Sequence, residues 1–272
     1  MLKVLAAAVG IAGLAPAASA TVVSGPTITL TRLDCGGAVI KDFNSFFSDT
    51  MELPSGPKRI TDSCYLIKRF DKYLLWDTGF PAELKGKVDE GKQMSATVRA
   101  TIVEQLAELG LKPSDIGTVG ISHMHGDHTG QARQFPGARL VIGKADFERS
   151  AGKDDPFGAW RGADAKVTLA TGDVDIFGDG SVIALNMPGH TPGHLSLLVK
   201  LASGPVLLTG DLYHSDLARE KRTVPPFNTS RAETLASMDR FERMAKQLGA
   251  RVIVQHEPAD IAKLPAFPKA AQ

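Results

Sequence analysis

The stretch ISHMHGDHTG, residues 121–130, holds His123, His125 and His128, nearly half of the seven histidines in the chain. Asp127 lies between the last two of them. Imidazole and carboxylate groups are the ligands that suit zinc and neighbouring divalent metals. Two interpretations are open for this stretch taken alone: a solvated loop whose histidines gather by chance, or a loop that binds a metal.

The other histidines also follow short apolar runs. Four such runs are typical of buried strands: Val119–Ser122, Val182–Asn186, Val206–Leu208 and Val252–Val254. Directly after these runs come, in turn, the cluster above, His190 with His194, Asp211 with His214, and His256. Any one of these histidines alone fits an ordinary core or surface position. The whole set, placed at the ends of predicted strands, indicates a site built at one edge of a sheet.

The first 20 residues, MLKVLAAAVGIAGLAPAASA, have the three parts of a secretory signal. Lys3 gives the charged start, an apolar run follows, and Ala18-Ser19-Ala20 supplies small residues for cleavage. The apolar run is broken at Pro16 and is too short for a typical transmembrane helix. We therefore expect residues 1–20 to be removed and residues 21–272 to form a single domain, periplasmic or secreted.

The charge balance argues against two classes of partner. The formal net charge of the whole chain is +1, and removal of Lys3 leaves equal numbers of basic and acidic residues. A neutral chain lacks the electrostatic attraction that nucleic acids and anionic membranes exert. We expect no nucleic-acid partner and no membrane insertion of the mature chain, and the sequence leaves a homodimer open.

The two cysteines, Cys35 and Cys64, do not have the C-x-x-C spacing of a zinc-binding pair. In an oxidising compartment they can form a disulfide if their strands adjoin. The sequence alone leaves that pairing open.

The hydrophobic patterns predict further strands and two long helices. The strands are Thr27–Leu33, a hairpin of Cys64–Lys68 with Tyr73–Trp76, Arg139–Ile142 and Leu195–Val199. One helix is predicted over Met94–Leu109, and a second runs from the capping box at Ser230 to Leu248. This order predicts two ββαβ-like halves that form a sandwich of sheets with helices outside. The segment 152–165 is predicted to be a surface loop.

The ordered motifs of the chain resemble those of the metallo-β-lactamase superfamily. They are DTG (77–79), HMHGDH (123–128), PGHTPGH (188–194), GD (210–211) and a late His256. The resemblance implies an α/β fold, a four-layer αββα sandwich of two mixed sheets with outer helices. It also implies two bound Zn²⁺ ions, with other divalent metals as alternatives.

The resemblance assigns the metal ligands residue by residue. His123, His125 and His190 would hold one ion, Asp127, His128 and His256 the other, and Asp211 would bridge both. His194 matches no ligand position and is expected to support the turn that presents His190. Asp77 matches a position where a carboxylate orients a ligand histidine.

This ligand set implies a hydrolase. A hydroxide bridging two ions would attack a carbonyl or phosphoryl group, with Asp127 passing a proton to the leaving oxygen. True β-lactamases usually have cysteine or serine where this chain has Asp211, and redox di-iron relatives have glutamate where it has His125. A non-catalytic metal carrier tends to use flexible histidine-rich tracts, whereas these ligands are dispersed over more than half of the chain.

Flanking segments are similar to those of N-acyl-homoserine lactonases. They are DFNSFFSDTMELPSGPKRITDSCYLI (42–67), LLWDTGFP (74–81) and HEPADIAKLPAFPKA (256–270). The resemblance implies opening of the lactone ring of N-acyl-homoserine lactones, which is quorum quenching. Other esters or phosphotriesters are the alternative substrates, and β-lactams fit less well.

An acyl chain requires an apolar groove. Phe43, Phe46 and Phe47 share one face at positions i, i+3 and i+4, and Phe157 and Trp160 lie in the loop expected opposite. We predict that these five aromatic residues line the groove. A role in the core or in a subunit contact is the alternative.

His214 marks a departure from the lactonases. They commonly carry a tyrosine three residues after the bridging aspartate, where this chain has His214. We predict that His214 donates a hydrogen bond to the substrate carbonyl oxygen without ligating metal. Tyr213 would point the other way if the segment is extended.

Overall fold

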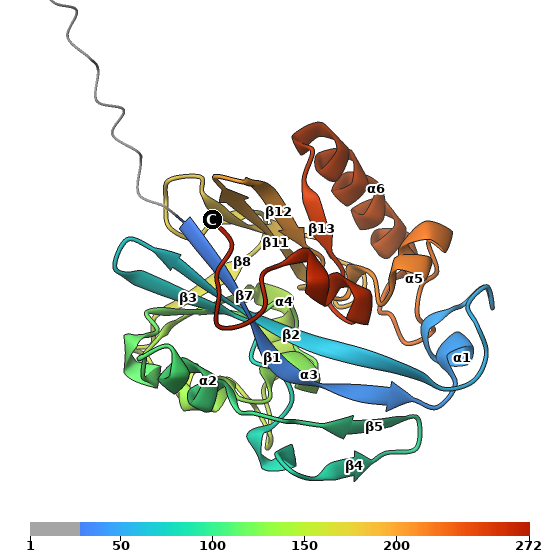
Figure 1. Cartoon of the computed structure of the whole chain (residues 1–272), viewed down its shortest axis with the longest axis horizontal. Coiled ribbons are helices and arrows are strands. Elements are labelled where there is room, and N and C mark those ends of the chain that lie inside the picture. Colours follow the sequence, from blue (N-terminus) through green and yellow to red (C-terminus); the bar gives the residue numbers. More distant parts are fainter. Residues whose placement is uncertain (1–27) are drawn as a thin grey trace, which may run out of the picture.

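The computed structural model describes residues 28–272. The signal peptide predicted for residues 1–20, the residues that follow it and the strand start predicted at Thr27 lie outside the described residues. The described part contains two mixed β-sheets with helices on their outer faces (Figure 1).

The first sheet has eight strands in the order β4-β5-β1-β2-β3-β6-β7-β8. Their bounds are β1 (Ile28–Ile40), β2 (Lys58–Arg69), β3 (Lys72–Trp76), β4 (Val88–Glu90), β5 (Met94–Thr97), β6 (Thr118–Gly120), β7 (Arg139–Gly143) and β8 (Val167–Ala170). The neighbouring strands β3, β6, β7 and β8 run parallel to one another. The remaining pairs of this sheet are antiparallel.

The second sheet has five strands in the order β13-β12-β11-β10-β9. Their bounds are β9 (Val174–Asp175), β10 (Val182–Asn186), β11 (Leu195–Leu201), β12 (Gly204–Leu208) and β13 (Arg251–Ile253). Only β12 and β13 pair in parallel. The helices are α1 (Phe43–Phe47), α2 (Ile102–Glu108), α3 (Gly126–Thr129), α4 (Lys144–Arg149), α5 (Asp216–Lys221) and α6 (Arg231–Leu248).

Three apolar cores separate four layers. Between the sheets, side chains such as Leu30 and Trp76 pack with Leu197 and Leu208. Outside the first sheet, α2 and α4 cover a second core, and outside the second sheet α6 covers a third. The predicted αββα sandwich of the metallo-β-lactamase type is confirmed.

Helix α6 forms as its sequence predicts. The Ser230 side chain accepts a hydrogen bond from the backbone N–H of Glu233 and so caps the start of the helix. Gly249 ends the helix with φ of 58°, a left-handed conformation that glycine adopts without steric cost. Met238 and Phe241 on its inner face are fully buried against the second sheet.

The helix predicted over Met94–Leu109 is wrong in its first half. Met94–Thr97 is strand β5, which pairs with β1, and the helix starts only at Ile102. Thr101 caps it: its side chain accepts from the Glu104 N–H while the Glu104 carboxylate accepts from the Thr101 N–H. The buried apolar residues before Thr101 belong to the sheet, although their spacing also fits a helix.

Cys35 and Cys64 form a disulfide between the neighbouring strands β1 and β2. The loop after β3 sits directly on this bridge. The N–H of Phe80 donates to the carbonyl of Cys35, and a Cβ atom at Gly79 would lie 2.5 Å from the Cys35 Cβ. Gly79 has φ of 62°, so both space and backbone conformation require glycine here.

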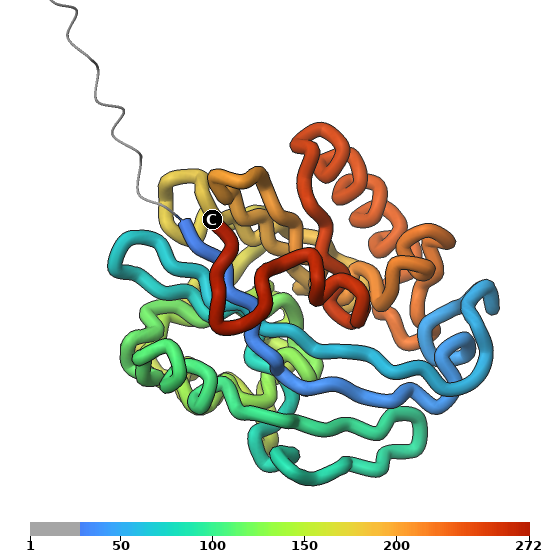
Figure 2. Tube along the Cα trace, viewed as in Figure 1, coloured from blue at the N-terminus to red at the C-terminus, as the bar shows by residue number. Residues whose placement is uncertain are grey.

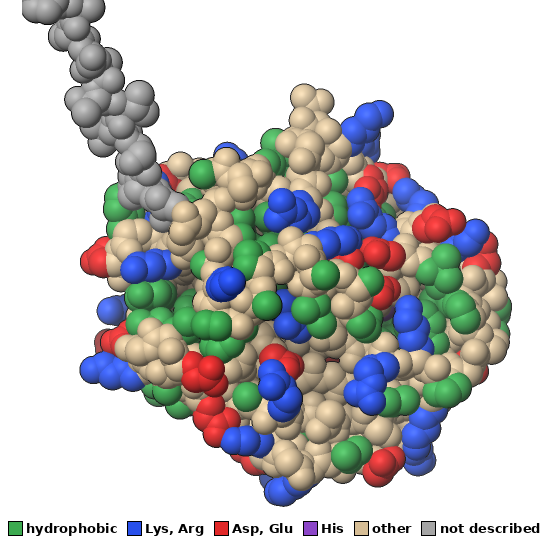
Figure 3. Space-filling model, in the orientation of Figure 1, with side chains coloured by type: hydrophobic (Ala, Val, Ile, Leu, Met, Phe, Trp, Pro, Cys, Tyr) green, Lys and Arg blue, Asp and Glu red, His purple; other side chains and the backbone are tan. Residues whose placement is uncertain are grey.

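The end of the chain returns to the beginning of the described part. Leu30 and Ala271 exchange two backbone hydrogen bonds, and the C-terminal segment runs beside the start of β1 (Figure 2). Acidic and basic side chains are interspersed over the face shown in Figure 3. None of the described helices is both long and apolar enough to cross a bilayer.

Candidate metal centre

The loops that follow the strands meet at one edge of the sandwich. The loop after β6 and helix α3 carry His123, His125, Asp127 and His128, and the loops after β10, β12 and β13 carry His190, Asp211 and His256. Their possible ligand atoms form two groups, each with all atoms within 4.8 Å of one another. One group is His123, His125, His190 and Asp211, and the other is Asp127, His128 and His256. The structure thus brings together all seven residues predicted to bind metal.

Asp211 lies between the two groups. Its Oδ2 is 3.6 Å from His123 Nε2 and 3.5 Å from His190 Nε2. Its Oδ1 is 3.2 Å from His128 Nε2 and 3.0 Å from His256 Nε2. One carboxylate therefore faces imidazoles of both groups, which is the position that a ligand shared by two ions requires.

Three of the imidazoles are oriented through their Nδ1 atoms. The partners of these atoms are Asp77 Oδ2 for His128 at 3.0 Å, Asn228 Oδ1 for His190 at 2.8 Å and the Thr61 carbonyl for His256 at 2.9 Å. In a neutral ring, an acceptor at Nδ1 keeps the proton there and leaves Nε2 unprotonated. The Nε2 atoms are thereby directed at the centre of the cluster.

The donor set fits divalent ions. His125 Nδ1 lies 2.9 Å from His123 Nε2 and 3.0 Å from His190 Nε2, so three ring nitrogens face one point. His128 Nε2 and Asp211 Oδ1 are buried without a hydrogen-bond partner, although they are only 3.2 Å apart. Buried polar atoms are normally paired, and a bound cation satisfies such atoms.

The electrostatics of the histidines differ between the two groups. Burial holds the pKa of His123 and His190 well below 6.5, so their rings are neutral and keep the lone pair that a metal ligand needs. In the second group burial also opposes the charged forms, but the nearby carboxylates Asp211 and Asp127 outweigh it. They raise the pKa of His128 well above 6.5 and that of His256 to about 9, so these two rings carry a proton that a metal ion would displace on binding. The same imidazoles hold the pKa of Asp211 well below its usual range despite its burial, so Asp211 is a carboxylate.

His194 supports Asp211 directly. Its Nδ1 lies 3.0 Å from the Met187 carbonyl, and its Nε2 accepts from the Asp211 N–H at 2.9 Å. This pairing fixes the proton on Nδ1. His194 thus contacts the turn that presents His190, as expected, through the Met187 carbonyl. Its ring also holds the backbone of Asp211.

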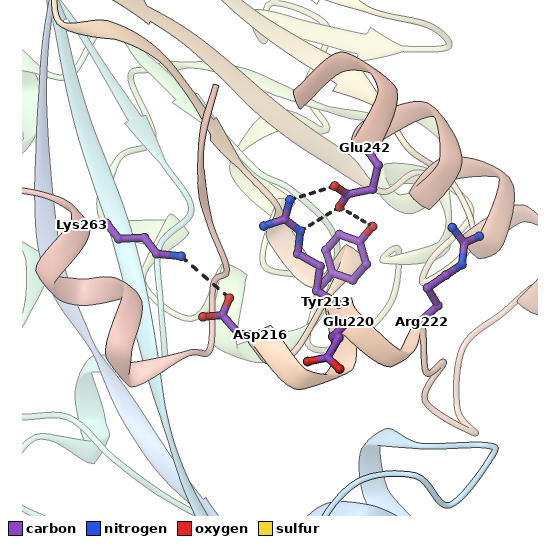
Figure 4. A pocket seen from close by; sticks show the side chains of 7 residues that line it. Tyr213, Asp216, Glu220, Arg222, Glu242 and Lys263 are labelled. Atoms are coloured by element: carbon purple, nitrogen blue, oxygen red, sulfur yellow. Dashed lines mark hydrogen bonds and ion pairs between the residues drawn. The ribbon is translucent and has the colours of Figure 1, made fainter. Parts of the chain in front are cut away.

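His214 lies at the centre and Tyr213 points away from it. His214 Nε2 is 3.2 Å from Asp211 Oδ2, and its ring stacks on Phe47 with centroids 4.2 Å apart. Burial lowers the pKa of His214, so its ring is neutral at pH 7. Tyr213 donates instead to Glu242 Oε1 at 3.0 Å, in a cavity of about 530 Å³ (Figure 4).

The cavity of Figure 4 is lined mostly by charged side chains, four of which pair with one another. Arg219 forms two hydrogen bonds to Glu242, and Lys263 pairs with Asp216. The histidines lie outside this cavity. A smaller cavity of about 120 Å³ opens beside the histidine–aspartate cluster. Its apolar wall is formed by Phe46, Phe47, Ile60, Met94 and Phe227.

The predicted groove is correct for two of its five aromatic residues. Phe46 and Phe47 line the small cavity, whereas Phe43 is buried behind Phe47, with ring centroids 5.3 Å apart. Phe157 and Trp160 are wrong as groove residues. Both are buried in the core outside the first sheet, where Trp160 Nε1 donates to the Ala138 carbonyl. Because segment 152–165 has no regular pattern, its sequence does not reveal that these two aromatic side chains turn into the core.

Sequence reasoning missed several residues of the site. Phe227 is 45% exposed and its ring centroid lies 5.1 Å from that of Phe46. Asn228, the next residue, orients His190. Asp62 is fully buried behind the His256 loop, where Gln255 Nε2 donates to its Oδ1, and burial raises the pKa of Asp62 to about 7. These residues lie in segments with no metal-binding pattern, so no local signal could have found them.

Comparison with known proteins agrees with this geometry. The family model of the metallo-beta-lactamase superfamily matches residues 61–256. N-acyl homoserine lactonase AttM of Azorhizobium caulinodans is 34% identical over 182 residues, which cover 62% of this chain and 67% of the relative. AttM of Agrobacterium fabrum is 33% identical over 183 residues, which cover 61% and 68% of the two chains.

Solved structures share the fold. A structure of a Bacillus thuringiensis AiiA mutant with N-decanoyl-L-homoserine bound at the active site superimposes with a TM-score of 0.77. It is 22% identical and covers 90% of this chain and 99% of its own. AidC, described as a dizinc quorum-quenching lactonase, has a TM-score of 0.65 at 19% identity, with 91% of each chain covered.

We expect two metal ions per chain, and we expect Asp211→Ala to lose both. The change removes the one carboxylate that faces both groups. Elemental analysis after dialysis measures the loss, and circular dichroism shows that the variant is folded. Asp239→Ala, an exposed aspartate on α6, serves as the control and should keep its metal. Full metal content in folded Asp211→Ala would contradict the bridging role.

Proposed function

The chain belongs to the metallo-β-lactamase superfamily, and we propose that it is an exported dinuclear zinc hydrolase that opens the lactone ring of N-acyl homoserine lactones. The observation that carries this proposal is the position of Asp211 between two imidazole groups beside an aromatic-walled cavity. The AttM relatives, named as N-acyl homoserine lactonases, support the substrate class.

Two bound ions supply Lewis acidity and lower the pKa of water so that it becomes a nucleophile at neutral pH. His123, His125 and His190 would hold one ion, His128, His256 and Asp127 the other, and Asp211 would contact both. Imidazole and carboxylate ligands suit zinc, which is the ion we propose.

The chain's own groups would position the lactone and carry the proton. The water oxygen forms a bond to the carbonyl carbon, the ring C–O bond breaks, and the leaving oxygen needs a proton. Asp127 is suited to pass that proton from the water, because its side chain is 18% exposed at the cavity. His214, whose Nε2 lies 3.2 Å from Asp211 Oδ2 at the cavity wall, is suited to donate a hydrogen bond to the carbonyl oxygen of a substrate bound there.

The cavity wall suits an acyl chain. Phe46, Phe47 and Phe227 contact one another through their rings, at centroid distances of 4.8 to 6.2 Å. Met94 and Ile60 complete an apolar surface next to the carboxylates. A lactone with an apolar tail can thus place its ester at the metal ligands and its tail on the aromatic wall.

Export is the second part of the proposal. The n-region, apolar run and small-residue cleavage site of residues 1–20 support it. The Cys35–Cys64 disulfide also supports it, because disulfides persist in oxidising compartments. In a bacterial host, we expect the protein in the periplasmic or secreted fraction with its N-terminus near Thr21. N-terminal sequencing of fractionated protein measures this, and an intact chain in the cytoplasm would contradict it.

We expect KM for the lactones to fall with acyl length until the aromatic wall is covered. Each buried methylene contributes about 0.8 kcal/mol, or roughly four-fold in affinity. Phe46→Ala should flatten this series, whereas Phe70→Ala, an exposed phenylalanine at the β2–β3 turn, should not. Steady-state kinetics on a series of acyl lengths measures the effect. A preference for phosphotriesters or β-lactams in a parallel panel would favour the alternative substrates.

We expect His214→Ala to lower kcat/KM by roughly ten-fold, about 1.4 kcal/mol, because a carbonyl already polarised by metal depends only partly on one donor. Both metals should stay bound, and His214→Tyr should keep most of the activity. Tyr213→Phe is the matched control, since this hydroxyl bonds Glu242 outside the site. Unchanged kinetics in His214→Ala would place the residue outside the reaction, and loss of metal would make it a ligand.

A further inference from the structure

Asp146 is a fully buried carboxylate that belongs to neither ligand group. It lies in α4, and both of its oxygens accept hydrogen bonds. Oδ2 accepts from the Met124 N–H at 3.1 Å and from the Thr191 hydroxyl at 2.6 Å, and Oδ1 accepts from the Gly193 N–H at 2.7 Å. Charge-assisted bonds of this kind are stronger than neutral ones.

The three donors come from two separate loops. Met124 lies between His123 and His125 in the loop after β6, a strand of the first sheet. Thr191 and Gly193 follow His190 in the turn after β10, a strand of the second sheet. Asp146 therefore joins the loops that carry all three imidazoles of the first group. Its bonds reach no residue adjacent to His128 or His256.

Two glycines let α4 approach the histidine turn. A Cβ atom at Gly193 would lie 2.8 Å from both the backbone nitrogen and Oδ1 of Asp146. A Cβ atom at Gly143, the N-cap of α4, would lie 1.9 Å from the Gly193 carbonyl oxygen. The backbone of α4 thus packs directly against the backbone of the turn, which brings the Asp146 carboxylate within hydrogen-bond distance of its donors.

We propose that Asp146 is a positioning residue for one of the two ions, the one held by His123, His125 and His190. By fixing both loops from one point, it sets the distance between His125 and His190, whose ring nitrogens are 3.0 Å apart. Besides the contact between these two rings, the Leu195 N–H donates to the Ser122 carbonyl where the two loops leave the sheets. This inference rests on the proposed dinuclear centre.

The test uses two single-ligand variants as backgrounds. His256→Ala removes a ligand of the second group only, so the remaining ion belongs to the first group. His125→Ala does the converse. Asp146→Asn keeps the size of the side chain but replaces one acceptor oxygen with an amide that faces a donor. Competition with a chelator measures Zn²⁺ affinity, and the visible spectrum of the Co²⁺ protein reports the ligand geometry.

We expect Asp146→Asn to weaken Zn²⁺ binding about ten-fold or more in the His256→Ala background. In the His125→Ala background, affinity should not change. The Co²⁺ spectrum should change only in the first background. Equal weakening in both backgrounds would show a general structural role and overturn the proposal, as would no weakening in either.

A second pair of variants leaves Asp146 in place. Thr191→Val removes one donor, and Gly193→Ala forces α4 and the turn apart, so both should weaken the same ion. Thr223→Val is the matched control, because this buried threonine bonds the Phe47 carbonyl away from both loops. If Asp146→Asn fails to fold, Thr191→Val decides the question. A wild-type chain with one ion, in the first group, would refute the dinuclear function, yet Asp146→Asn would still have to weaken that ion.

Discussion

The structure depends on one carboxylate shared among imidazoles from both sheets. Asp211 lies within 3.6 Å of five histidine Nε2 atoms, those of His123, His128, His190, His214 and His256. Burying a carboxylate is costly, and the raised pKa values of His128 and His256 show that these two rings offset part of that cost by holding protons. Two cations held between the carboxylate and the rings would satisfy all of these groups together. The ends of β6, β10, β12 and β13 must therefore meet at one edge, and the two-sheet architecture is what allows it.

Residues outside the two ligand groups support both of them. Asp77 receives the Ser122 N–H on one oxygen and faces His128 Nδ1 with the other. The loop that carries Asp77 rests on the Cys35–Cys64 disulfide through Gly79 and Phe80. The first group is instead joined through Asp146 and Asn228. Residues far away in the sequence thus orient the imidazoles. The imidazoles lie on loops that could not hold this geometry alone.

The ligand set could be predicted from sequence because its members repeat one local pattern, a polar residue just after a short apolar run. The capped helix α6 could be predicted for a similar reason, since Ser230 and Gly249 mark its two ends. The groove could not. Phe157 and Trp160 sit in an irregular segment whose direction depends on tertiary packing, and Met94 belongs to a strand whose apolar spacing also fits a helix. Pairing with β1 and β4 decides between those two structures.

In the segment after Asp211, two adjacent side chains point in opposite directions, so only one of them faces the site. In the extended backbone after the short helical turn, Tyr213 and His214 face opposite sides. The Tyr213 hydroxyl donates to Glu242, which also accepts two hydrogen bonds from Arg219. The hydroxyl therefore points away from the histidine–aspartate cluster. That anchor also fixes His214, whose ring has Phe47 on one side and His256 on the other. An imidazole at this position is therefore held by packing on both faces, with its Nε2 3.2 Å from Asp211 Oδ2 at the wall of the small cavity.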